Sequence, residues 1–432
     1  MADVLLIQPP LPPPLNAYVT DMVLTPPLGL CYIASCLKDS YQVAIVDAAI
    51  LNLDEKATKD AIKKEHPKIL GITATTFTYK SALKIAQTAK RLNKDAHTIL
   101  GGPHVTFTAE EAAKNPHVDY VVRHEGEVTM KQLSDFLLRR KGRLEDIKGI
   151  TYRKGDGLVS APPQPLIENL DDLPFPSRDL TPLHLYKIPA SIITSRGCPS
   201  QCIFCAAGAM SGQRYRVRSP GNIVEEAKVM LKEMNPGFFF VADDTFTIFH
   251  DRVRAICKQF KELGIRWVCE SRVNTVTEEI VEELAAAGCF AMQFGVESGS
   301  QKVLNSILKG ITIEQVRRAV KWCLEAGIIP VCSFMAPHPE DGWETVKETE
   351  DFMNELKGLG AQIYVSLTTP FPGTSLYKNA KELGIELLSD DTDDYNLATP
   401  VIRTKNFSVE DVEEIFDRFM AISKETIPFE KV

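Results

Sequence analysis

Three cysteines stand close together in the segment SRGCPSQCIFC, at Cys198, Cys202 and Cys205. Their spacing, C-x3-C-x2-C, places three thiols on one loop after an apolar run. Such a loop can wrap three thiolates around three irons of a four-iron four-sulfur cube, which leaves the fourth iron open to a small molecule. A structural zinc ion is the alternative, but it wants four protein ligands, and no fourth cysteine or histidine lies close by in the sequence.

The other seven cysteines stand singly in apolar contexts, where a free cysteine is usually a small buried hydrophobe. They are Cys31, Cys36, Cys257, Cys269, Cys289, Cys323 and Cys332. Ten cysteines in a chain of 432 residues whose start has no secretion signal favour reduced thiols over disulfides. We therefore expect a cytoplasmic protein.

The composition excludes some classes of function. A net charge of -8 lacks the basic excess that binding to a phosphate backbone needs, so nucleic acid is not expected as a partner. Nowhere do eighteen uncharged apolar residues run together, so no membrane span is expected. A hydrophobic content of 44% and a charged content of 25% are typical of a globular chain.

The first part of the chain alternates short apolar runs with helical patterns, from Val4 to Val122. This order predicts an α/β fold, with a doubly wound, Rossmann-like parallel sheet over residues 1-149. Ligands of such sheets bind beyond the carboxyl ends of the strands. The residues predicted at those ends include Gln8, Pro9, Asp47, Thr73, Thr75, Thr76, Phe77, Gly101, Gly102, Pro103, His104, Glu125, Gly126 and Glu127.

The chain changes character after this domain. Residues 150-189 hold a hairpin pattern, GITYRKGDGLVSAP, and the proline-rich LDDLPFPSRDLTP, which together predict an inter-domain linker. From residue 190 to 375, six strand-helix units predict a partial (β/α)6 barrel of the TIM-like kind, with its chemistry at the carboxyl ends of the strands. Residues 376-432 are charged and predict a helical C-terminal region.

At the cysteine loop the sequence resembles the radical S-adenosylmethionine superfamily. The hallmark of that family is this cysteine spacing with an aromatic residue before the last cysteine, here Phe204. The resemblance continues strand by strand to about residue 375. It implies that the open iron of a 4Fe-4S cluster binds S-adenosylmethionine, and that one electron then yields methionine and a 5'-deoxyadenosyl radical. Phe204 would lie against the adenine, and an electron donor such as flavodoxin or ferredoxin is implied.

The resemblance also assigns residues at the ends of the barrel strands. Asp243 and Asp244, in VADDTF, match the place that holds the methionine amino group. Arg272, in CESRVN, and Glu297 with Ser298, in GVESGS, match the places that meet the carboxylate and the ribose. A carboxylate wants a cation, and ribose hydroxyls want acceptors. For Arg272 and Asp243 the alternative is an internal salt bridge across the barrel mouth.

The first domain resembles the cobalamin-binding domain of cobalamin-dependent radical S-adenosylmethionine enzymes. The resemblance rests on PPLGLCYIASCL, ILGGPHVTF and VVRHEGE, in that order before a cysteine barrel. It implies that the strand-end residues named above bind cobalamin, except Asp47, for which no role is implied. The G-x-G-x-x-G phosphate loop of dinucleotide-binding domains is missing after the first strand. Gly101 and Gly102 would let the backbone approach a large ligand, or would simply end the fourth strand in a turn.

We expect no histidine on the lower face of the cobalt. The D-x-H-x-x-G run that supplies one in other cobalamin domains is missing, and the loop from Gln8 to Asn16 contains no histidine. Thr75, Thr76 and Phe77 are the candidates to cover that face, although they could instead cap the strand. His104 is a tempting ligand, but a single histidine on a loop is more often a hydrogen-bonded structural residue.

The resemblance implies two uses of S-adenosylmethionine. One molecule forms methylcobalamin, and another yields the radical that removes hydrogen from an unactivated carbon, which then receives the methyl group. A C-methyltransferase is therefore the leading expectation. Radical oxidative cyclisation or ring rearrangement with the same cofactors is one alternative, and a non-catalytic redox or cobalamin sensor is another. Methylthio transfer to RNA is disfavoured, because the sequence has no second cysteine trio. The substrate is left open.

Overall fold

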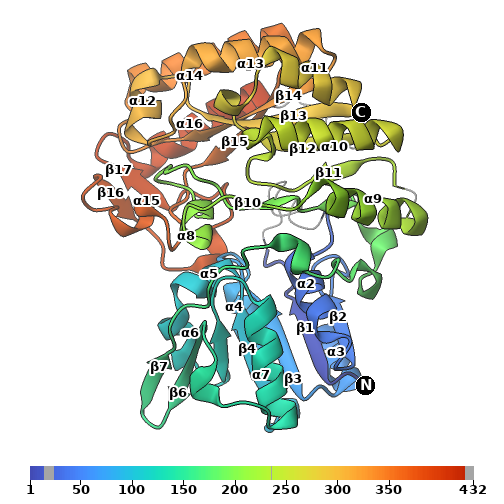
Figure 1. Cartoon of the computed structure of the whole chain (residues 1–432). Helices are drawn as coiled ribbons and strands as arrows, with labels where there is room; N and C mark the ends of the chain where they lie inside the picture. The colour runs from blue at the N-terminus through green and yellow to red at the C-terminus, as the bar shows by residue number, and fades with distance from the viewer. Residues whose placement is uncertain (14–23, 235, 424–432) are drawn as a thin grey trace. The chain divides into compact units, whose positions relative to one another are not determined.

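A computed structural model describes residues 1-13, 24-234 and 236-423 of the chain (Figure 1). The chain divides into two compact units. Unit 1 comprises Met1–Pro189 and Asp391–Asn396, and unit 2 comprises Ala190–Asp390 and Leu397–Val432. In the described ranges, no helix combines the length and the apolar composition that crossing a membrane requires.

Unit 1 is built on a seven-stranded sheet with the order β2-β1-β3-β4-β5-β6-β7. The strands are β1 Val4–Gln8, β2 Val43–Asp47, β3 Ile69–Thr73, β4 His97–Gly101, β5 Tyr120–Val122, β6 Ile150–Lys154 and β7 Gly157–Ser160. The first five are parallel, and β1 pairs with both β2 and β3. The strand order therefore reverses between β1 and β3, which makes this position the topological switch point of the sheet. Sheets of this kind bind ligands in the crevice beyond the carboxyl ends of the strands at the switch point.

Helices cover both faces of this sheet, as the doubly wound prediction requires. They are α2 Leu28–Leu37, α3 Glu55–Glu65, α4 Tyr79–Leu92, α5 Pro103–Phe107, α6 Ala109–Lys114 and α7 Glu127–Arg139. Alternate residues of β1 enter two different cores: Leu5 packs with Ile85 of α4, whereas Leu6 packs with Leu133 of α7. The predicted α/β architecture of the first domain is confirmed.

The hairpin of β6 and β7, which the sequence analysis placed in the linker, extends the sheet of unit 1. β6 pairs antiparallel with β5, with Tyr152 opposite Tyr120. The following segment also contacts unit 1, because the Tyr186 hydroxyl donates to the Asp47 carboxylate at 2.7 Å. The other oxygen of Asp47 accepts from the backbone of its own turn, so this buried carboxylate is committed to the fold.

A short segment from late in the chain also belongs to unit 1. Residues 391-396 contain a 3-10 turn, and Lys80 on α4 forms ion pairs with Asp391 and Asp393 there. The 3-10 helices of the described residues are η1 Leu144–Asp146, η2 Leu170–Asp172, η3 Arg178–Leu180, η4 Leu183–Leu185, η5 Phe246–Ile248, η6 Val273–Thr275 and η7 Thr392–Asp394. The chain therefore passes from one unit to the other more than once.

Unit 2 is built on a six-stranded parallel sheet whose strands follow one another in chain order. They are β8 Ser191–Ile192, β11 Phe239–Val241, β12 Trp267–Ser271, β13 Cys289–Glu297, β14 Ile329–Ala336 and β15 Gln362–Leu367. The intervening helices are α9 Pro220–Met234, α10 His250–Glu262, α11 Glu278–Ala286, α12 Gln301–Ser306, α13 Ile313–Glu325 and α14 Trp343–Leu359. The six strand-helix units predicted from the sequence are thus confirmed.

Capping side chains fix where two of these helices begin. The Thr277 hydroxyl accepts from the backbone N–H of Ile280 at the start of α11. The Thr312 hydroxyl accepts from the N–H of Gln315, whose side chain in turn accepts from the Thr312 N–H. This reciprocal capping box satisfies donors that the first turn of α13 leaves free.

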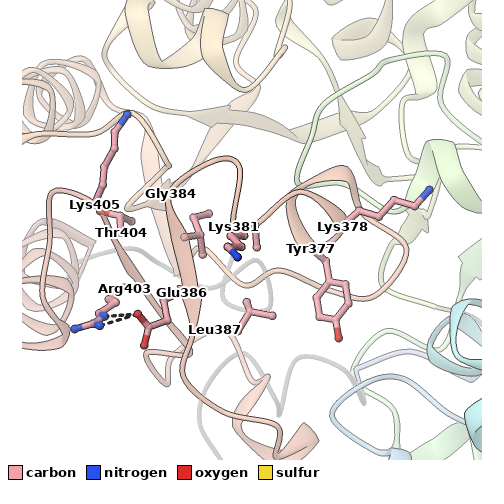
Figure 2. A pocket seen from close by; sticks show the side chains of 11 residues that line it. Tyr377, Lys378, Lys381, Gly384, Glu386, Leu387, Arg403, Thr404 and Lys405 are labelled. Atoms are coloured by element: carbon pink, nitrogen blue, oxygen red, sulfur yellow. Dashed lines mark hydrogen bonds and ion pairs between the residues drawn. The ribbon is translucent and has the colours of Figure 1, made fainter.

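The C-terminal region contains the predicted helix, α16 Val409–Ser423, and elements that the sequence analysis did not anticipate. α15 Ser375–Lys378 is a single turn, and β16 Ile385–Leu387 pairs antiparallel with β17 Ile402–Thr404. A hollow of about 750 Å³ lies beside this pair, and Arg403 is paired there with Glu386 (Figure 2). The predicted tail beyond residue 423 lies outside the described residues.

One buried ion pair supports the strand that leads to the cysteines. Arg218 and Glu226 are both buried and lie 2.5 Å apart, and Arg218 also donates to the Ile193 carbonyl at 2.8 Å. Removing one partner leaves the other charge buried without compensation. We predict that Glu226→Ala lowers the free energy of unfolding by about 3–5 kcal/mol in urea titrations. Glu225→Ala, at an exposed neighbour, should change it little, and equal losses in both variants would contradict this account.

Candidate metal and cofactor sites

The cysteine loop of unit 2 is closed at its base by a short ladder. β9 Ser195–Arg196 pairs antiparallel with β10 Arg216–Val217, and α8 Ala207–Ser211 lies between them in the chain. Gly197 stands directly before the first cysteine, with a φ of 95°. A Cβ at Gly197 would lie 2.1 Å from the Arg214 carbonyl oxygen. Only glycine fits there, so the loop needs it in order to turn away from β9.

Backbone hydrogen bonds hold the middle of the loop. The Ile203 N–H donates to the Ile307 carbonyl at 3.1 Å, and the Ile203 carbonyl accepts from the Leu376 N–H at 2.7 Å. The Cys205 N–H donates to the Cys202 carbonyl at 3.2 Å, which makes a tight turn between the last two cysteines. The loop is therefore fixed to segments more than a hundred residues away in the sequence.

All three loop cysteines are free thiols. Cys198 is buried, Cys202 is half-buried and Cys205 is exposed. The Arg272 guanidinium donates to the Cys202 sulfur at 3.5 Å. This donor set fits a cluster that takes three thiolates from one loop. Across the described ranges, no three His, Cys, Asp or Glu side chains converge as the ligands of a single metal ion.

Asp243 anchors the start of the loop. β8 and β11 pair in register with Ile192 beside Val241, so Thr194 lies beside Asp243. The Asp243 carboxylate accepts from the N–H groups of Thr194 and Ser195 at 2.6 and 2.9 Å, and from both of their hydroxyls. Asp243 is buried and both of its oxygens are used. The arrangement makes it a structural acceptor rather than an open one.

Asp244 is placed differently from its neighbour. Its carboxyl is exposed, and it accepts from the Gly197 N–H at the entry to the loop. Desolvation by the surrounding loop and then the charge of Asp243 raise its pKa above the ordinary value, whereas the Gly197 hydrogen bond lowers it. Of the two predicted aspartates, Asp244 is therefore the one that can meet a ligand's ammonium group.

Arg272 does not form the internal salt bridge considered as its alternative role, as far as the described residues show. Besides the Cys202 sulfur, its guanidinium donates to the Lys309 carbonyl and to the Asn274 side chain. Lys309 in turn pairs with Glu297, with Nζ 2.6 Å from Oε1. This network links the cysteine loop to the ends of β12 and β13.

Glu297 and Ser298 follow each other but are held in different ways. Glu297 has a φ of 72°, which is uncommon for a residue with a side chain and marks local strain. The Ser298 hydroxyl is 3.1 Å from that of Thr349 and accepts from the Ser300 N–H at 3.1 Å. Ser298 is buried, so its hydroxyl supports the turn, whereas Glu297 is part of the ion pair beside the loop.

Two residues beside Phe204 escaped the sequence analysis. The Lys309 Nζ lies 5.6 Å from the centre of the Phe204 ring, and the His338 ring lies 6.1 Å from it. His338 is buried, desolvation lowers its pKa, and neither ring nitrogen has a hydrogen-bond partner among the described residues. Its position just after β14 could have revealed it. Nothing in the local sequence points to Lys309.

In unit 1, the predicted site residues at the ends of β1 and β3 differ in how deeply they are buried. Gln8, Thr73 and Thr75 are half-buried, whereas Thr76 and Phe77 are buried. The Thr75 hydroxyl lies 2.9 Å from that of Thr78, which also accepts from the Thr75 N–H at 3.0 Å. These bonds cap the turn before α4. Thr75 is the residue of its trio that keeps exposed surface.

Gly102 is required by packing inside unit 1. Its φ is 102°, and a Cβ there would lie 2.8 Å from the backbone of Ala74. A Cβ at Gly101 would meet only the Val122 carbonyl, at 3.7 Å, so that position leaves room. Pro103 is exposed and begins α5. Gly102 is therefore needed because its backbone packs closely against Ala74 at the end of β3. Gly101 has more free space around its Cα than Gly102 has.

His104 is a buried residue of α5, and its ring faces α4. Its Nδ1 is 3.2 Å from the Thr76 hydroxyl, and its ring is 4.3 Å from that of Tyr79. Within the described ranges, Nε2 has no hydrogen-bond partner. Desolvation lowers the pKa of His104 to about 4, so the ring is neutral at pH 7. It sits in a packed interior.

The loop before α7 also serves the fold. The Glu125 carboxylate accepts from the Ile167 N–H at 2.8 Å. Gly126 directly precedes α7, and a Cβ at this position would lie 3.1 Å from the Ile33 side chain. Glu127 is buried in the first turn of α7, where the helix dipole favours a negative charge. Gln8, Thr73, Thr75 and Gly101 are half-buried at the strand ends, and Pro9 is buried. Residues 14-16 of the loop from Gln8 to Asn16 lie outside the described residues.

Comparisons with known proteins match both units. The family model of the radical SAM superfamily matches residues 192–353, and that of the B12 binding domain matches residues 21–134. An uncharacterized methyltransferase of Pyrococcus horikoshii is 37% identical over 413 residues, which cover 93% of this chain and 89% of that protein. The anaerobic magnesium-protoporphyrin IX monomethyl ester cyclase of Rubrivivax gelatinosus is 30% identical over 412 residues, which cover 92% of this chain and 72% of that protein.

Solved structures share the fold of the whole chain. The radical S-adenosylmethionine methyltransferase TsrM from Kitasatospora setae, with cobalamin and a 4Fe-4S cluster bound, superimposes with a TM-score of 0.77 at 18% identity. The match covers 98% of this chain and 89% of that one. The cobalamin-dependent enzyme OxsB gives a TM-score of 0.76 at 19% identity, over 96% of this chain and 65% of that one. At these identities the likeness extends to the fold alone.

The two neighbouring aspartates should respond differently to the same change. We predict that Asp243→Asn lowers iron retention about tenfold, because an amide cannot accept four hydrogen bonds and leaves buried donors unsatisfied. Asp244→Asn should keep its iron but bind S-adenosylmethionine about tenfold more weakly, since a charged acceptor is lost. Iron and sulfide analysis and anaerobic equilibrium dialysis measure the two effects. The same loss of iron in both variants would contradict the separate roles.

Burial of His104 should make unit 1 sensitive to acid. A histidine titrates near 6.5 when unfolded and at about 4 here, so its contribution to stability is complete above pH 6.5 and is lost as the pH falls towards 4. The loss amounts to about 3 kcal/mol. The opening free energy that hydrogen exchange of α5 reports should fall over this range in the natural protein, and less in His104→Phe. His184→Gln, at an exposed histidine, is the control and should behave like the natural protein. If His104→Phe shows the same pH dependence as the natural protein, the prediction is refuted.

Proposed function

Because this chain belongs to the cobalamin-binding radical S-adenosylmethionine enzymes, we propose that it transfers a methyl group to an unactivated carbon of its substrate. The observation that carries the proposal is the cysteine loop of unit 2, in a chain whose unit 1 matches a B12 binding domain. When bound, the cluster and S-adenosylmethionine supply a radical that removes hydrogen from carbon, and cobalamin supplies the methyl group.

The residues around the loop bind and orient the reactants. Cys198, Cys202 and Cys205 hold the cluster, and Asp243 keeps the loop start in place through its four acceptor contacts. Asp244 presents an exposed carboxylate that can accept from the methionine ammonium group.

The other side of the site holds the nucleoside and the carboxylate. Phe204 offers a ring face for the adenine, and Lys309 and His338 pack around that ring. Arg272 donates to a cluster thiol and is the cation that can meet the methionine carboxylate. Glu297, fixed by Lys309, is the acceptor closest to this group for a ribose hydroxyl.

In unit 1, we assign cobalamin to the strand ends at the switch between β1 and β3. Thr75 and Gly101 keep exposed surface there and can contact a large planar ligand. His104 is held by Thr76 and Tyr79 inside the unit. We therefore assign Thr75, and no histidine, to the lower face of the corrin.

The reaction also needs a supply of electrons. We propose a one-electron donor of the flavodoxin or ferredoxin type, since each cleavage of S-adenosylmethionine consumes one electron at the cluster. We also propose that the protein works in the cytoplasm, because a cluster held by three thiolates requires reduced cysteines, and Cys198, Cys202 and Cys205 are free thiols.

Product mass tests the proposal. With S-adenosylmethionine that carries a trideuterated methyl group, anaerobic holoenzyme and a small-molecule extract of the source cells should yield a product that has gained one trideuterated methyl group. 5'-Deoxyadenosine should form at the same time. Cys202→Ala should lose the cluster and both products, because two thiolates hold a cube poorly. Cys289→Ala, at a buried cysteine of β13 outside the loop, should lose neither.

The alternatives predict other products. Radical cyclisation would give 5'-deoxyadenosine and a product without deuterium, and cyclase is the activity named for the Rubrivivax relative at 30% identity. A sensor would bind the cofactors and form no 5'-deoxyadenosine. Either result would replace methyl transfer as the function.

A further inference from the structure

The sheet of unit 2 has one face covered by helices and an inner face opposite to it (Figure 1). Trp267 of β12 packs against Phe260 of α10, with ring centres 5.6 Å apart. Phe334 of β14 packs against Phe352 of α14, with ring centres 6.4 Å apart. Because side chains alternate along a strand, residues at odd separations from these aromatic residues point to the inner face. Glu270 on β12 is one of them.

Glu270 belongs to a polar row that crosses the inner face. The parallel register places Gln293 of β13 beside Glu270, and Tyr364 of β15 beside Ser333 of β14. The Gln293 side-chain amide donates to the Ser333 hydroxyl at 3.1 Å, so these two residues satisfy each other. We call Glu270, Gln293, Ser333 and Tyr364 the polar row. A packed barrel interior is usually filled by branched apolar residues, so a polar row indicates contact with a ligand.

Glu270 is the member of the row without a partner. Its carboxyl makes no hydrogen bond or ion pair with any described residue, and it keeps part of its surface exposed. Desolvation, followed by the charges of Asp244 and Asp243, raises its pKa to about 7. A half-buried carboxyl without a partner is unfavourable in the free protein. A bound group that donates to it would remove this penalty.

The charges around Glu270 select the kind of group. Asp243 and Asp244 lie on the neighbouring strand end and add negative charge. The nearby cations serve other groups, because Arg272 donates to a thiol and a carbonyl and is assigned to the methionine carboxylate, and Lys309 is paired with a carboxylate. This surplus of negative charge favours a cation over a neutral hydroxyl and disfavours a carboxylate or phosphate.

We propose that Glu270 binds a protonated amino group of the substrate and so holds the carbon that reacts beneath the cysteine loop. The proposal rests on the proposed function, in that it names the substrate class of the same site. Glu270 lies two residues before Arg272, which contacts Cys202. An amine bound to Glu270 therefore brings its neighbouring carbons close to where the radical forms. The rest of the polar row contacts the remainder of the substrate.

Three probes of equal chain length test the head group: n-hexylammonium, n-hexanol and n-hexanoate. Unlabelled probes serve the NMR measurement, and perdeuterated probes serve the radical reaction. Saturation-transfer NMR on anaerobic holoenzyme with S-adenosylmethionine measures their binding. We expect the ammonium probe to bind the natural protein about tenfold more tightly than the alcohol, and Glu270→Gln to remove this preference. Glu282→Gln on the exposed face of α11 makes the same chemical change elsewhere and should keep the preference.

The radical reaction gives a second readout. A 5'-deoxyadenosyl radical that meets the bound probe breaks a C–D bond and forms a C5'–D bond, and the probe radical takes an electron and a proton from the dithionite-reduced buffer. Monodeuterated 5'-deoxyadenosine should be most abundant with the ammonium probe and fall about tenfold in Glu270→Gln. Equal deuterium from all three probes, or an unchanged yield in Glu270→Gln, would overturn the proposal.

The two proposals fail in different ways. If the natural protein forms no 5'-deoxyadenosine, radical chemistry fails, while the NMR comparison still decides the role of Glu270. If Glu270→Gln instead weakens the binding of S-adenosylmethionine itself by equilibrium dialysis, Glu270 serves the methionine ammonium group and the substrate assignment is wrong. Unchanged binding of S-adenosylmethionine in Glu270→Gln, together with loss of the ammonium preference, supports it.

Discussion

The site of unit 2 depends on one carboxylate. Asp243 accepts four hydrogen bonds from Thr194 and Ser195, and these bonds fix the direction in which the chain leaves β8 and enters the cysteine loop. Gly197 can then turn sharply, and the thiols follow on a loop that is held further along by backbone hydrogen bonds and by the contact of Arg272 with Cys202. A charged acceptor makes stronger hydrogen bonds than a neutral one, and burial strengthens them further. The side chains that we propose to bind the reactants are therefore positioned by Asp243, whose own carboxylate oxygens are both occupied by hydrogen bonds.

Much of this arrangement could be predicted from the sequence, because the signals were local. The cysteine spacing, the alternation of strands and helices, and the threonines that begin α11 and α13 each occupy a few neighbouring residues. What the sequence left open depends on contacts between distant segments. Asp243 and Asp244 are adjacent and chemically identical, and only the pairing of Val241 with Ile192 decides which one faces Thr194. Lys309 lies 12 residues beyond Glu297 at no recognisable spacing, and only the folded chain brings the two together.

The two glycines of unit 1 illustrate the same limit. The sequence analysis allowed either a close approach to a ligand or a turn for both Gly101 and Gly102. The structure separates them, because a Cβ on Gly102 would collide with the Ala74 backbone while Gly101 has space. Likewise, the β6-β7 hairpin carried a clear turn signal, but the sequence could not tell that its first strand would pair with β5. Pairing at a sheet edge depends on a partner about thirty residues away.

The short segment 391-396 has a consequence for how the protein can be divided. It is covalently part of a long stretch of unit 2, yet it is counted within unit 1, where two aspartates pair with Lys80 on α4. The polypeptide therefore joins the units at three points, after residues 189, 390 and 396. A single tether would let two modules be exchanged between genes as contiguous pieces, but three connections do not. Neither unit can therefore be separated intact from the other by a single cut of the polypeptide.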